Sequence, residues 1–482
     1  MSQKHSRRGL RARFAIAVGR MASVLLKRLK KQASSYPGHL AKNLDPEILA
    51  KLAYGQRILV VTGTNGKTTT CMYLREILHA RGYQVHSNAS GANLETGLIT
   101  CLLTKGTADY IVLEVDEACF ARTAAALAPA AVLVTNLFRD QLDRYGELDA
   151  VYRLIRSGLE ELDKTILLLN ADDPSVSHLG LELVSNPNCE LRYYGLDFKQ
   201  QADELENRDD SKPAQAAQVL ALIDRALCPV CSTGLEYLAK SSAQLGLYHC
   251  PSCSYKRPDP DFLFFQSEDR RFFMRASDEQ GGSASFENPL AGLYNAYNLA
   301  SAAALASLCL PETPLSLLIQ GAKGSQASFG RQERIPYRDG KSICFILVKN
   351  PAGYAESLHL VSKAEDLGGL AFLLNDNYPD GRDVSWIYDV PFEEIQAIEA
   401  QGYVISGTRH ADLALRLDYW GLDLEKAEIC EESAAADACL RLLDTLPANR
   451  CLYILPNYTA LLHLRAGLRQ RLGLSEAWVE EG

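Results

Sequence analysis

The sequence predicts an α/β protein with more than one domain. Beginning at Ile58, short apolar runs that are typical of buried strands alternate with longer segments of helical periodicity. Such alternation is typical of parallel sheets whose strands are connected by helices. A chain of 482 residues is also too long for a single hydrophobic core, so we expect two or three domains.

The composition is that of an ordinary globular protein, with 47% hydrophobic and 23% charged residues. The net charge of −9 argues against a general nucleic-acid binder, which is usually basic, so no nucleic-acid partner is expected. No stretch of the sequence reaches the ~18 to 20 consecutive apolar residues that a membrane span needs.

Residues 1–54 are predicted to form a short, basic helical segment. Its apolar run Phe14–Val18 is brief and is soon interrupted by Arg20, so we reject a secretory signal. Two interpretations stay open for this segment. It is either an amphipathic helix that rests on anionic lipid at the inner face of the membrane, or a helix packed on the next domain with a solvated outer face. We favour the second.

The run Ile58–Thr62 ends at a glycine turn, and a helical segment that includes Cys71–Leu78 comes after the turn. Glycines allow backbone N–H groups to approach phosphate oxygens, and the N-terminus of a helix adds partial positive charge. A chance glycine turn is the alternative, because this loop is shorter than the usual phosphate loop. The flanking strand and helix favour a nucleotide site.

The residues of this loop have distinct expected roles. Lys67 can neutralise the charge of the β- and γ-phosphates, and the hydroxyl of Thr68 can bind Mg2+. The expected nucleotide-binding residues of the loop are Gly63, Thr64, Asn65, Gly66, Lys67, Thr68 and Thr69.

Three more apolar runs, at 110–113, 131–134 and 166–169, are predicted to be parallel strands of the same sheet. Ligands of such sheets bind at the carboxyl ends of the strands. Any single polar residue there can instead cap a helix. The polar residues at these strand ends are Glu114, Asp116, Glu117, Asn136, Asp140, Asn170, Asp172 and Asp173.

Residues 200–217 are polar and acidic and are predicted to be a surface loop. Beyond them, two C-x-x-C pairs separated by eighteen residues predict a zinc ribbon with the ligands Cys228, Cys231, Cys250 and Cys253. Four thiolates leave no open position on a tetrahedral ion, so this zinc is structural. Redox-active pairs are the alternative. A nucleotide site implies a reducing, cytoplasmic location, and the other nine cysteines are expected in the core.

In the C-terminal third, apolar runs at 343–348, 371–374, 403–406 and 451–455 alternate with helical segments and predict a second open α/β sheet of the Rossmann-like kind. The segments 406–412 and 457–460 come directly after strands, as ligand loops do. His410 is expected to be a surface residue rather than a catalyst.

The loop sequence V-T-G-T-N-G-K-T-T at 61–69 resembles the ATP loop of the Mur ligases and folylpolyglutamate synthetases. These enzymes phosphorylate a carboxylate and then form an amide from it. Four further segments, at 113–117, 135–143, 170–174 and 292–298, resemble the family in the same order. The resemblance implies a Mur ligase-like P-loop ATPase domain at 55–326, with the ribbon inserted at about 224–260, and a C-terminal α/β domain at 327–482.

The resemblance also implies roles for single residues. Glu114 matches the family's Mg2+-binding glutamate and is expected to share the ion with Thr68. Asn295 belongs to a segment near the nucleotide, and Arg331 to the arginine segment at the family's domain junction. Gln141 replaces a histidine that helps many members to bind a second metal, so a complete second-metal site is not expected.

A zinc ribbon inside such an ATPase is similar to the MurT branch of the family, the synthetase subunits of lipid II isoglutaminyl synthases. Segments 90–94, 245–250, 257–260 and 374–389 also resemble this branch, although Tyr388 replaces a tryptophan. The resemblance covers about residues 36–465. The separate UDP-sugar-binding N-terminal domain of the main Mur ligases is not expected here.

This branch implies ATP-dependent amidation, through an acyl phosphate, of the α-carboxylate of D-glutamate in lipid II, which gives D-isoglutamine. We find no glutaminase nucleophile in the sequence, so the ammonia is expected from a separate GatD-type glutaminase subunit in a heterodimer. Lys67 and Glu114 are the expected catalytic residues of this chain. The resemblance also implies that one aspartate of the C-terminal α/β domain (327–482), which we call the third domain, completes the catalytic triad of the glutaminase. We favour Asp376, then Asp383, with Asp380 and Asp389 as the other candidates.

Two other functions are open. The chain can be a stand-alone ligase that adds an amino acid to a folate or a peptide, which would need its own amino-acid pocket and no partner. It can also be a non-catalytic zinc scaffold, which we rank last because a scaffold has no need of Lys67, Thr68 and Glu114 together.

Overall fold

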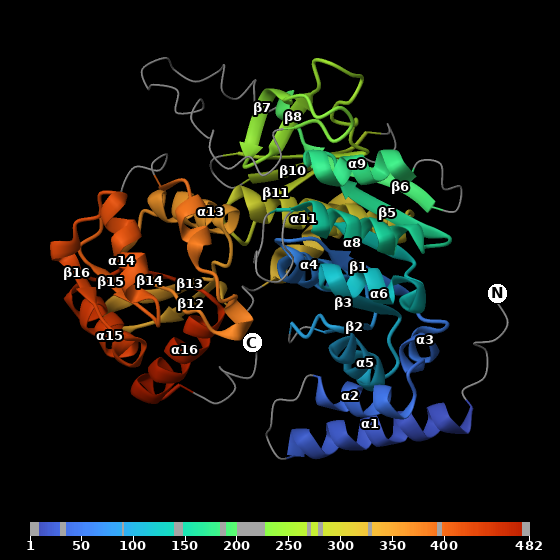
Figure 1. Cartoon of the computed structure of the whole chain (residues 1–482), viewed down its shortest axis with the longest axis horizontal. Helices are drawn as coiled ribbons and strands as arrows, with labels where there is room; N and C mark the ends of the chain where they lie inside the picture. The colour runs from blue at the N-terminus through green and yellow to red at the C-terminus, as the bar shows by residue number, and fades with distance from the viewer. Residues whose placement is uncertain are drawn as a thin grey trace.

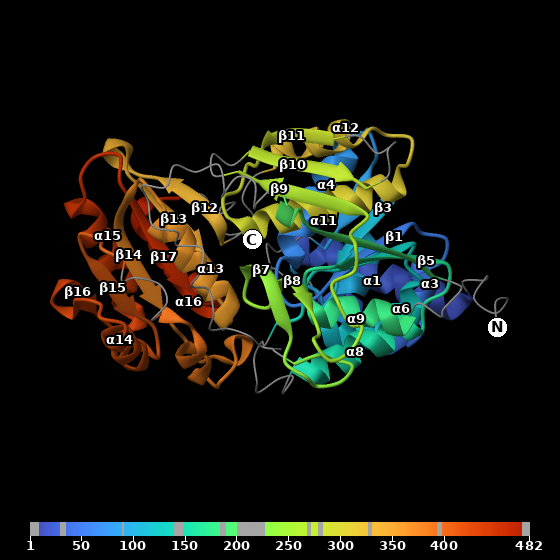
Figure 2. The same cartoon turned by 90° about the horizontal axis from the view of Figure 1, so that it is seen from above.

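The computed structural model describes residues 9–28, 35–88, 91–138, 148–183, 189–199, 227–267, 271–277, 283–325, 330–392 and 398–474. Two large open sheets and one two-stranded hairpin lie in this part of the chain, with helices on both faces of each large sheet (Figure 1, Figure 2). The predicted α/β fold with parallel sheets is therefore confirmed. The predictions for Ser90, Asp140, Gln141 and the loop 200–217 lie outside the described residues. The domain limits at 54 and 326 stay predictions.

The first sheet has the strand order β11-β10-β9-β6-β5-β4-β1-β3-β2. Its pairs are parallel from β2 to β9, and β9, β10 and β11 are antiparallel. The strands at 110–114, 131–134 and 165–170 agree with the sequence prediction. The strands are β1 (Ile58–Thr62), β2 (Val85–Ser87), β3 (Tyr110–Glu114), β4 (Ala131–Val134), β5 (Thr165–Asn170), β6 (Cys189–Leu196), β9 (Phe262–Gln266), β10 (Arg271–Ala276) and β11 (Ser283–Glu287).

The central strand β1 is buried along its whole length and faces two separate cores. Leu59 and Val61 belong to one core, Ile58 and Val60 to the other, because successive side chains of a strand point to opposite faces. A strand buried on both faces has no polar alternation, which explains its continuous apolar sequence. The first core is covered by α4 (Lys67–Ala80), α11 (Leu293–Cys309) and α12 (Leu315–Gly321). The second is covered by α3 (Ile48–Ala53), α5 (Glu95–Thr104), α6 (Glu117–Leu127), α8 (Leu148–Glu160) and α9 (Pro174–Leu183).

The N-terminal segment packs on this second core. Helix α1 (Leu10–Arg28) contacts α2 (Tyr36–Leu44) and α5 and forms an outer edge of the molecule (Figure 1). The approach is close: a Cβ atom on Gly19 would lie 2.6 Å from the Leu103 side chain. One face of α1 therefore packs on the domain, as the favoured interpretation expects, and the choice between a solvated and a lipid-bound outer face stays a prediction. No helix in the described ranges combines the length and the apolar character needed to cross a membrane.

The second large sheet has the order β12-β13-β17-β14-β15-β16 and is parallel except for β12, which is antiparallel to β13. Its strands are β12 (Arg331–Pro336), β13 (Ser342–Ile346), β14 (Leu367–Leu373), β15 (Tyr403–Ser406), β16 (Ala427–Ile429) and β17 (Cys451–Pro456). One face is covered by α13 (Pro351–Ser362) and α14 (His410–Tyr419), the other by α15 (Ala435–Thr445) and α16 (Tyr458–Leu472). The short 3-10 helices are η2 (Ala322–Gly324), η3 (Arg338–Gly340), η4 (Tyr378–Asp380), η5 (Ser385–Asp389), η7 (Leu424–Lys426) and η8 (Glu432–Ala434).

A two-stranded hairpin, β7 (Glu236–Ser242) and β8 (Leu245–His249), forms the ribbon beside the first sheet. Asp172, just after β5, connects the ribbon to the body and has no exposed surface. Its carboxylate accepts hydrogen bonds from Arg257 Nε at 2.6 Å, Tyr297 Oη at 2.6 Å and Leu196 N at 2.8 Å. A buried carboxylate thus joins the ribbon, helix α11 and strand β6.

We expect Asp172→Ala to lower the free energy of unfolding by about 3–5 kcal/mol, because the Arg257 guanidinium would be left buried without its counter-charge. The double variant Asp172→Ala/Arg257→Met should recover part of that loss. Chemical denaturation measures both. The matched control is Arg441→Ala, which breaks an ion pair with Glu428 in which both side chains are exposed and should cost at most about 1 kcal/mol. Equal, small losses for Asp172→Ala and the control would contradict a role of Asp172 in holding the layers together.

Candidate active site and metal centre

The glycine turn between β1 and α4 has the backbone that the sequence predicts. Gly63 and Gly66 have φ angles of +117° and +86°, a region that other residues rarely adopt. A Cβ atom on Gly63 would lie 2.5 Å from Thr135 Oγ1, and one on Gly66 would collide with the side chain of Asn298. The turn therefore passes close to two neighbouring elements, and α4 begins directly after it at Lys67.

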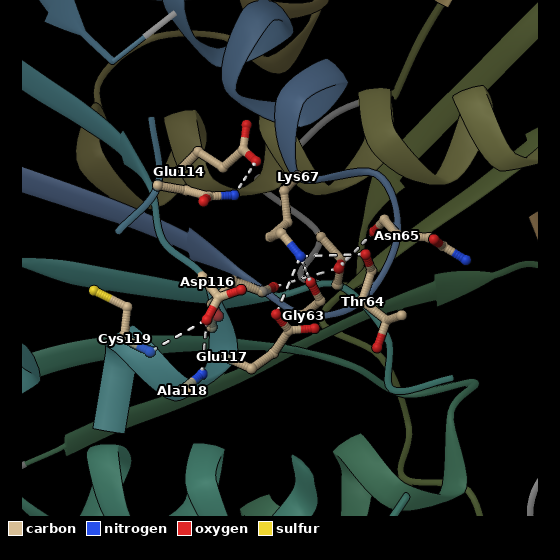
Figure 3. A network of polar contacts seen from close by, with 12 residues as sticks. Gly63, Thr64, Asn65, Lys67, Glu114, Asp116, Glu117, Ala118 and Cys119 are labelled. Carbon is tan, nitrogen blue, oxygen red and sulfur yellow. Dashed lines mark hydrogen bonds and ion pairs between the residues drawn. The ribbon is translucent and has the colours of Figure 1, made fainter. Parts of the chain in front are cut away.

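Lys67 is buried and lies over its own loop (Figure 3). Its ammonium donates hydrogen bonds to the carbonyl oxygen of Gly63 and, at 3.2 Å, to that of Thr64. It also lies 3.3 Å from Glu117 Oε2, at the start of α6. The cation predicted to meet phosphates is thus held at the loop, with a carboxylate beside it.

Glu114 and Thr68, the predicted Mg2+ ligands, are in direct contact. Thr68 Oγ1 donates to Glu114 Oε2 at 2.7 Å, and Asn93 Nδ2 donates to Glu114 Oε1 at 3.0 Å. Asn88 fixes the backbone here, since its side chain accepts from Glu114 N at 2.9 Å and donates to Glu114 O at 2.8 Å. A carboxylate and a hydroxyl are hard oxygen ligands, so this pair at the N-terminus of α4 fits Mg2+.

Three other polar residues at strand ends have structural roles. Asp116 caps α6 by accepting from Ala118 N at 3.1 Å and Cys119 N at 3.3 Å. Asp173 does the same for α9 through Ser175 N at 2.8 Å, and burial raises its pKa to about 6. Asp172 belongs to the buried network described above. These contacts agree with the alternative that single carboxylates cap helices.

Asn295 and Arg331 lie at the edge of the site. Asn295 is buried in the first turn of α11, where its Oδ1 accepts from Asn298 Nδ2 at 3.3 Å. Asn298 in turn accepts from Thr70 Oγ1 at 3.3 Å, next to the phosphate loop. Arg331 begins β12, and the neighbouring Gln332 donates to Ala291 O at 2.7 Å. The structure brings Asn295 beside the loop and Arg331 to the connection between the two sheets.

The second sheet reaches the phosphate loop through two residues that the sequence analysis missed. Asn350 and Asn65 exchange side-chain hydrogen bonds of 2.9 Å and 3.3 Å, and Lys349 Nζ donates to Thr64 O at 3.1 Å. Asn350 also caps α13 by accepting from Gly353 N at 2.8 Å. The pair Asn350-Pro351 after the strand is a helix-start signal that would have placed Asn350 at a strand end.

The third-domain aspartates occupy different environments. Asp376 is partly exposed, and its carboxylate accepts from Thr408 Oγ1 at 2.9 Å and from Arg409 Nη1 at 3.3 Å, which lowers its pKa. Asp383 is exposed and accepts from Ser385 N at 2.8 Å at the start of η5. Asp389 is exposed, whereas Asp380 is buried against Thr459. His410 is half-buried, with Nδ1 2.8 Å from Gly407 O.

The four ribbon cysteines come together as predicted, with their sulfur atoms within 4.8 Å of one another. The Sγ atoms of Cys228 and Cys253 are 3.6 Å apart, and those of Cys231 and Cys250 are 3.4 Å apart. Zn–S bonds of about 2.3 Å in a tetrahedron place sulfurs roughly 3.8 Å apart, so the cluster fits zinc. The nine other cysteines are free thiols that are buried or partly buried, as expected of core residues.

Comparison with known proteins assigns the chain to a family. The MurT subunit of the lipid II isoglutaminyl synthase (glutamine-hydrolyzing) from Streptococcus pneumoniae is 34% identical to it, over 96% of this chain and 98% of the relative. The chain belongs to the MurT family. The MurT subunit from Staphylococcus aureus strain COL is 32% identical, over 93% of this chain and 95% of its own length. The profile of the MurT ligase C-terminal family matches residues 347–461, and that of the Mur ligase middle domain matches 61–224.

Solved structures share the fold of this MurT family member. A pseudomurein peptide ligase type C from Methanothermus fervidus matches with a TM-score of 0.63 and 20% identity, over 88% of this chain and 81% of that one. The folylpolyglutamate synthase of Mycobacterium tuberculosis matches with a TM-score of 0.59 and 12% identity, over 96% and 99% of the two chains. At such identities the likeness concerns the fold alone.

The cysteine cluster predicts that the purified chain contains one zinc ion. Cys231→Ser should lower the metal affinity more than about 100-fold, since changes outside the ligand set alone cost 10–100-fold in other zinc sites. Elemental analysis measures the zinc, and thermal unfolding measures its effect on stability. Cys309→Ser, outside the ribbon, is the matched control and should keep the zinc. Metal-free chain with disulfides between the cysteines would support redox pairs instead.

Proposed function

We propose that this chain is the synthetase subunit of a two-subunit, ATP-dependent carbon–nitrogen ligase of peptidoglycan synthesis. Its substrate would be the α-carboxylate of D-glutamate in lipid II, its product D-isoglutamine, and its partner a GatD-type glutaminase that supplies ammonia. The observation that carries the proposal is the match over 96% of the chain to a MurT subunit of that name. A phosphate loop with Lys67 held on its carbonyl oxygens, and Thr68 in contact with Glu114 beside it, supports the ATP-dependent step. ATP and the glutamyl group of lipid II meet in the cytoplasm, so we place the reaction there.

The chemistry explains why ATP is needed. A carboxylate does not react with ammonia at neutral pH because oxide would be the leaving group. Attack of a carboxylate oxygen on the γ-phosphorus of ATP releases ADP and gives an acyl phosphate. Ammonia then attacks the acyl carbon, inorganic phosphate leaves, and a proton is lost from nitrogen. The amide and phosphate are the products of this second step.

The residues of the loop stabilise the charge that develops on the transferred phosphoryl group. Lys67, held over the loop, can move from the carbonyl oxygens of Gly63 and Thr64 to the phosphate oxygens. Glu117 keeps the ammonium within reach. Thr68 and Glu114 would hold Mg2+, which when bound neutralises phosphate charge.

The third domain would close this site. Lys349 and Asn350 already contact Thr64 and Asn65 of the phosphate loop, so the second sheet is attached at the nucleotide. We propose that Arg331 and Asn295 act nearby, at the connection between the domains. The Lys349 ammonium of the third domain lies at the phosphate loop and can stabilise the anionic phosphate group while ammonia attacks the acyl carbon.

The glutaminase contact would use residues that follow strand β14 of the second large sheet. Asp376 comes after β14 and stays our first candidate for completing the partner's triad, with Asp383 next. A carboxylate held by Thr408 and Arg409 is fixed in direction, which suits a residue that orients a histidine. Asp383 is more exposed and closer to η5. Asp380 is the weakest candidate because it is buried against α16.

The central experiment uses lipid II, ATP and either ammonium or glutamine, with and without the co-expressed glutaminase subunit. We expect amide formation with ammonium in every case where the chain is present, and with glutamine only when the partner is present. Mass spectrometry of the stem peptide measures the product. Joining of an amino acid to a folate or a peptide by the chain alone would favour the stand-alone ligase and contradict the proposal.

We expect Asp376→Asn to reduce the glutamine-driven rate by about 100-fold or more, because the histidine of the partner would lose the carboxylate that orients it as a general base. The ammonium-driven rate should not change. Asp383→Asn and Asp389→Asn are the competing variants, and Asp418→Asn, at an exposed position of α14, is the control. If Asp383→Asn alone abolishes glutamine use, the triad residue is Asp383.

Lys67→Met should lower both the ammonium- and the glutamine-driven rates by about 10²–10³-fold, since it removes a cation from the transferred phosphoryl group. Asn350→Ala should instead raise the KM for ATP with a smaller effect on kcat, because it removes the contact of the third domain with Asn65. Steady-state kinetics of ATP hydrolysis with lipid II and ammonium give kcat and the KM for ATP of both variants and so distinguish the two effects. An unchanged KM in Asn350→Ala would rule out that contact as part of the nucleotide site.

A further inference from the structure

Helix α1 has an unusual distribution of side-chain sizes. Its inner face buries Ile16 and the small residues Ala12, Ala15, Gly19 and Ser23 against α2 and α5. Its outer face exposes five large apolar side chains by 53–85% of their surface: Leu10, Phe14, Met21, Val24 and Leu25. A helix whose only role is to pack on a domain usually buries its large apolar residues.

The five side chains form one patch, which we call the α1 face. At about 100° per residue, positions 10, 14, 21, 24 and 25 fall within one third of the helix circumference. They account for five of the twenty-one large hydrophobic residues exposed in the described part of the chain. Scattered exposed hydrophobics are ordinary, whereas a contiguous patch marks an interaction site.

Positive charge surrounds the α1 face. Arg13 and Arg20 lie along one edge of the patch and Arg11 along the other, and Arg28 is at its C-terminal end. All four are exposed, and the helix contains no acidic residue, although the whole chain has a net charge of −9. Arg11 and Arg20 donate through Nε to Leu44 O at 2.6 Å and Leu103 O at 3.0 Å, so their positions beside the patch are fixed.

We propose that the α1 face binds the surface of a lipid bilayer that contains anionic lipid. Apolar side chains flanked by arginine match a helix that lies in the interface, with its apolar face at the acyl boundary and its cations at the phosphate groups. A second copy of this chain is a poorer partner for the α1 face. In a symmetric dimer through this face, the arginines of one copy would lie against the arginines of the other and repel them. The location of α1 at an outer edge of the molecule leaves the face accessible to a flat surface (Figure 1).

This inference goes beyond the proposed function, since lipid binding requires neither ATP nor lipid II nor the glutaminase. If the proposed function is also correct, the bilayer that holds the substrate's lipid tail is the one that α1 binds. Failure of the lipid-binding proposal does not imply failure of the amidation proposal, or the reverse, because vesicle binding is measured without substrate and amidation can be measured in detergent.

The test is co-sedimentation of the full chain with vesicles of phosphatidylcholine alone and of phosphatidylcholine mixed with phosphatidylglycerol. We expect binding to the mixed vesicles that weakens as salt is added. Phe14→Gln/Met21→Gln should lower the partition coefficient by about ten-fold or more, given the apolar area that leaves the bilayer. Arg13→Gln/Arg28→Gln should weaken binding to the mixed vesicles and leave phosphatidylcholine binding unchanged.

Leu415→Gln/Tyr419→Gln, which removes exposed apolar side chains of α14, is the matched control and should bind like the unchanged chain. Circular dichroism and detergent-based activity confirm that the variants fold. Equal binding of the Phe14→Gln/Met21→Gln variant and the control would overturn the proposal, as would no binding to either vesicle. A dimer or a glutaminase complex that only the α1 variant loses would assign the face to a protein instead.

Discussion

The site depends on how closely the backbone between β1 and α4 passes the elements around it. Thr64 N donates to Asn136 O at 2.8 Å, and Thr135 Oγ1 donates to Asn65 O at 2.8 Å. Gly63 and Gly66 make these approaches possible because a side chain at either position would meet Thr135 or Asn298. The strand before the turn is buried on both faces, so the turn is anchored at its first residue and by the helix at its last.

The third domain contacts this anchored turn, and the ribbon contacts the third domain. Asn350 contacts Asn65 of the loop, and Ser242 at the tip of the ribbon hairpin donates to Glu356 of α13 at 2.5 Å. Burial raises the pKa of Glu356. Helix α13 thus contacts the phosphate loop at its cap and the ribbon in its second turn. The ribbon that carries the cysteine cluster is therefore connected to the position of the third domain.

The sequence predicts the parts of the site in which local pattern determines structure. A buried strand, a glycine turn and a helix are adjacent in the chain, and the spacing of the two C-x-x-C pairs by itself predicts a metal-binding cluster. Prediction failed where contacts join distant residues. Lys349 and Asn350 contact the loop across 285 positions, and Asn88 supports Glu114 across 26. The local signal Asn350-Pro351 marks the start of a helix, but no local pattern indicates these long-range contacts.

The predicted limits of some strands were wrong for a related reason. β14 begins at Leu367 rather than 371, because Gly368 and Gly369, which disfavour a strand on their own, fit closely against Arg450, Leu442 and Leu452. The strand β10 was not predicted because its alternation of exposed and buried residues, which one solvated face allows, does not give a continuous apolar run. Tertiary packing decided both cases.

The contacts of Lys67 have a consequence for what can enter the site. Its ammonium is already satisfied by two carbonyl oxygens and by Glu117, so an incoming group must compete with a carboxylate for the same cation. A weakly charged anion gains little from that exchange, whereas a polyphosphate carries enough charge to displace the internal partner. If the loop binds ATP as proposed, the internal partners of Lys67 would favour ligands of high charge density over weakly charged anions.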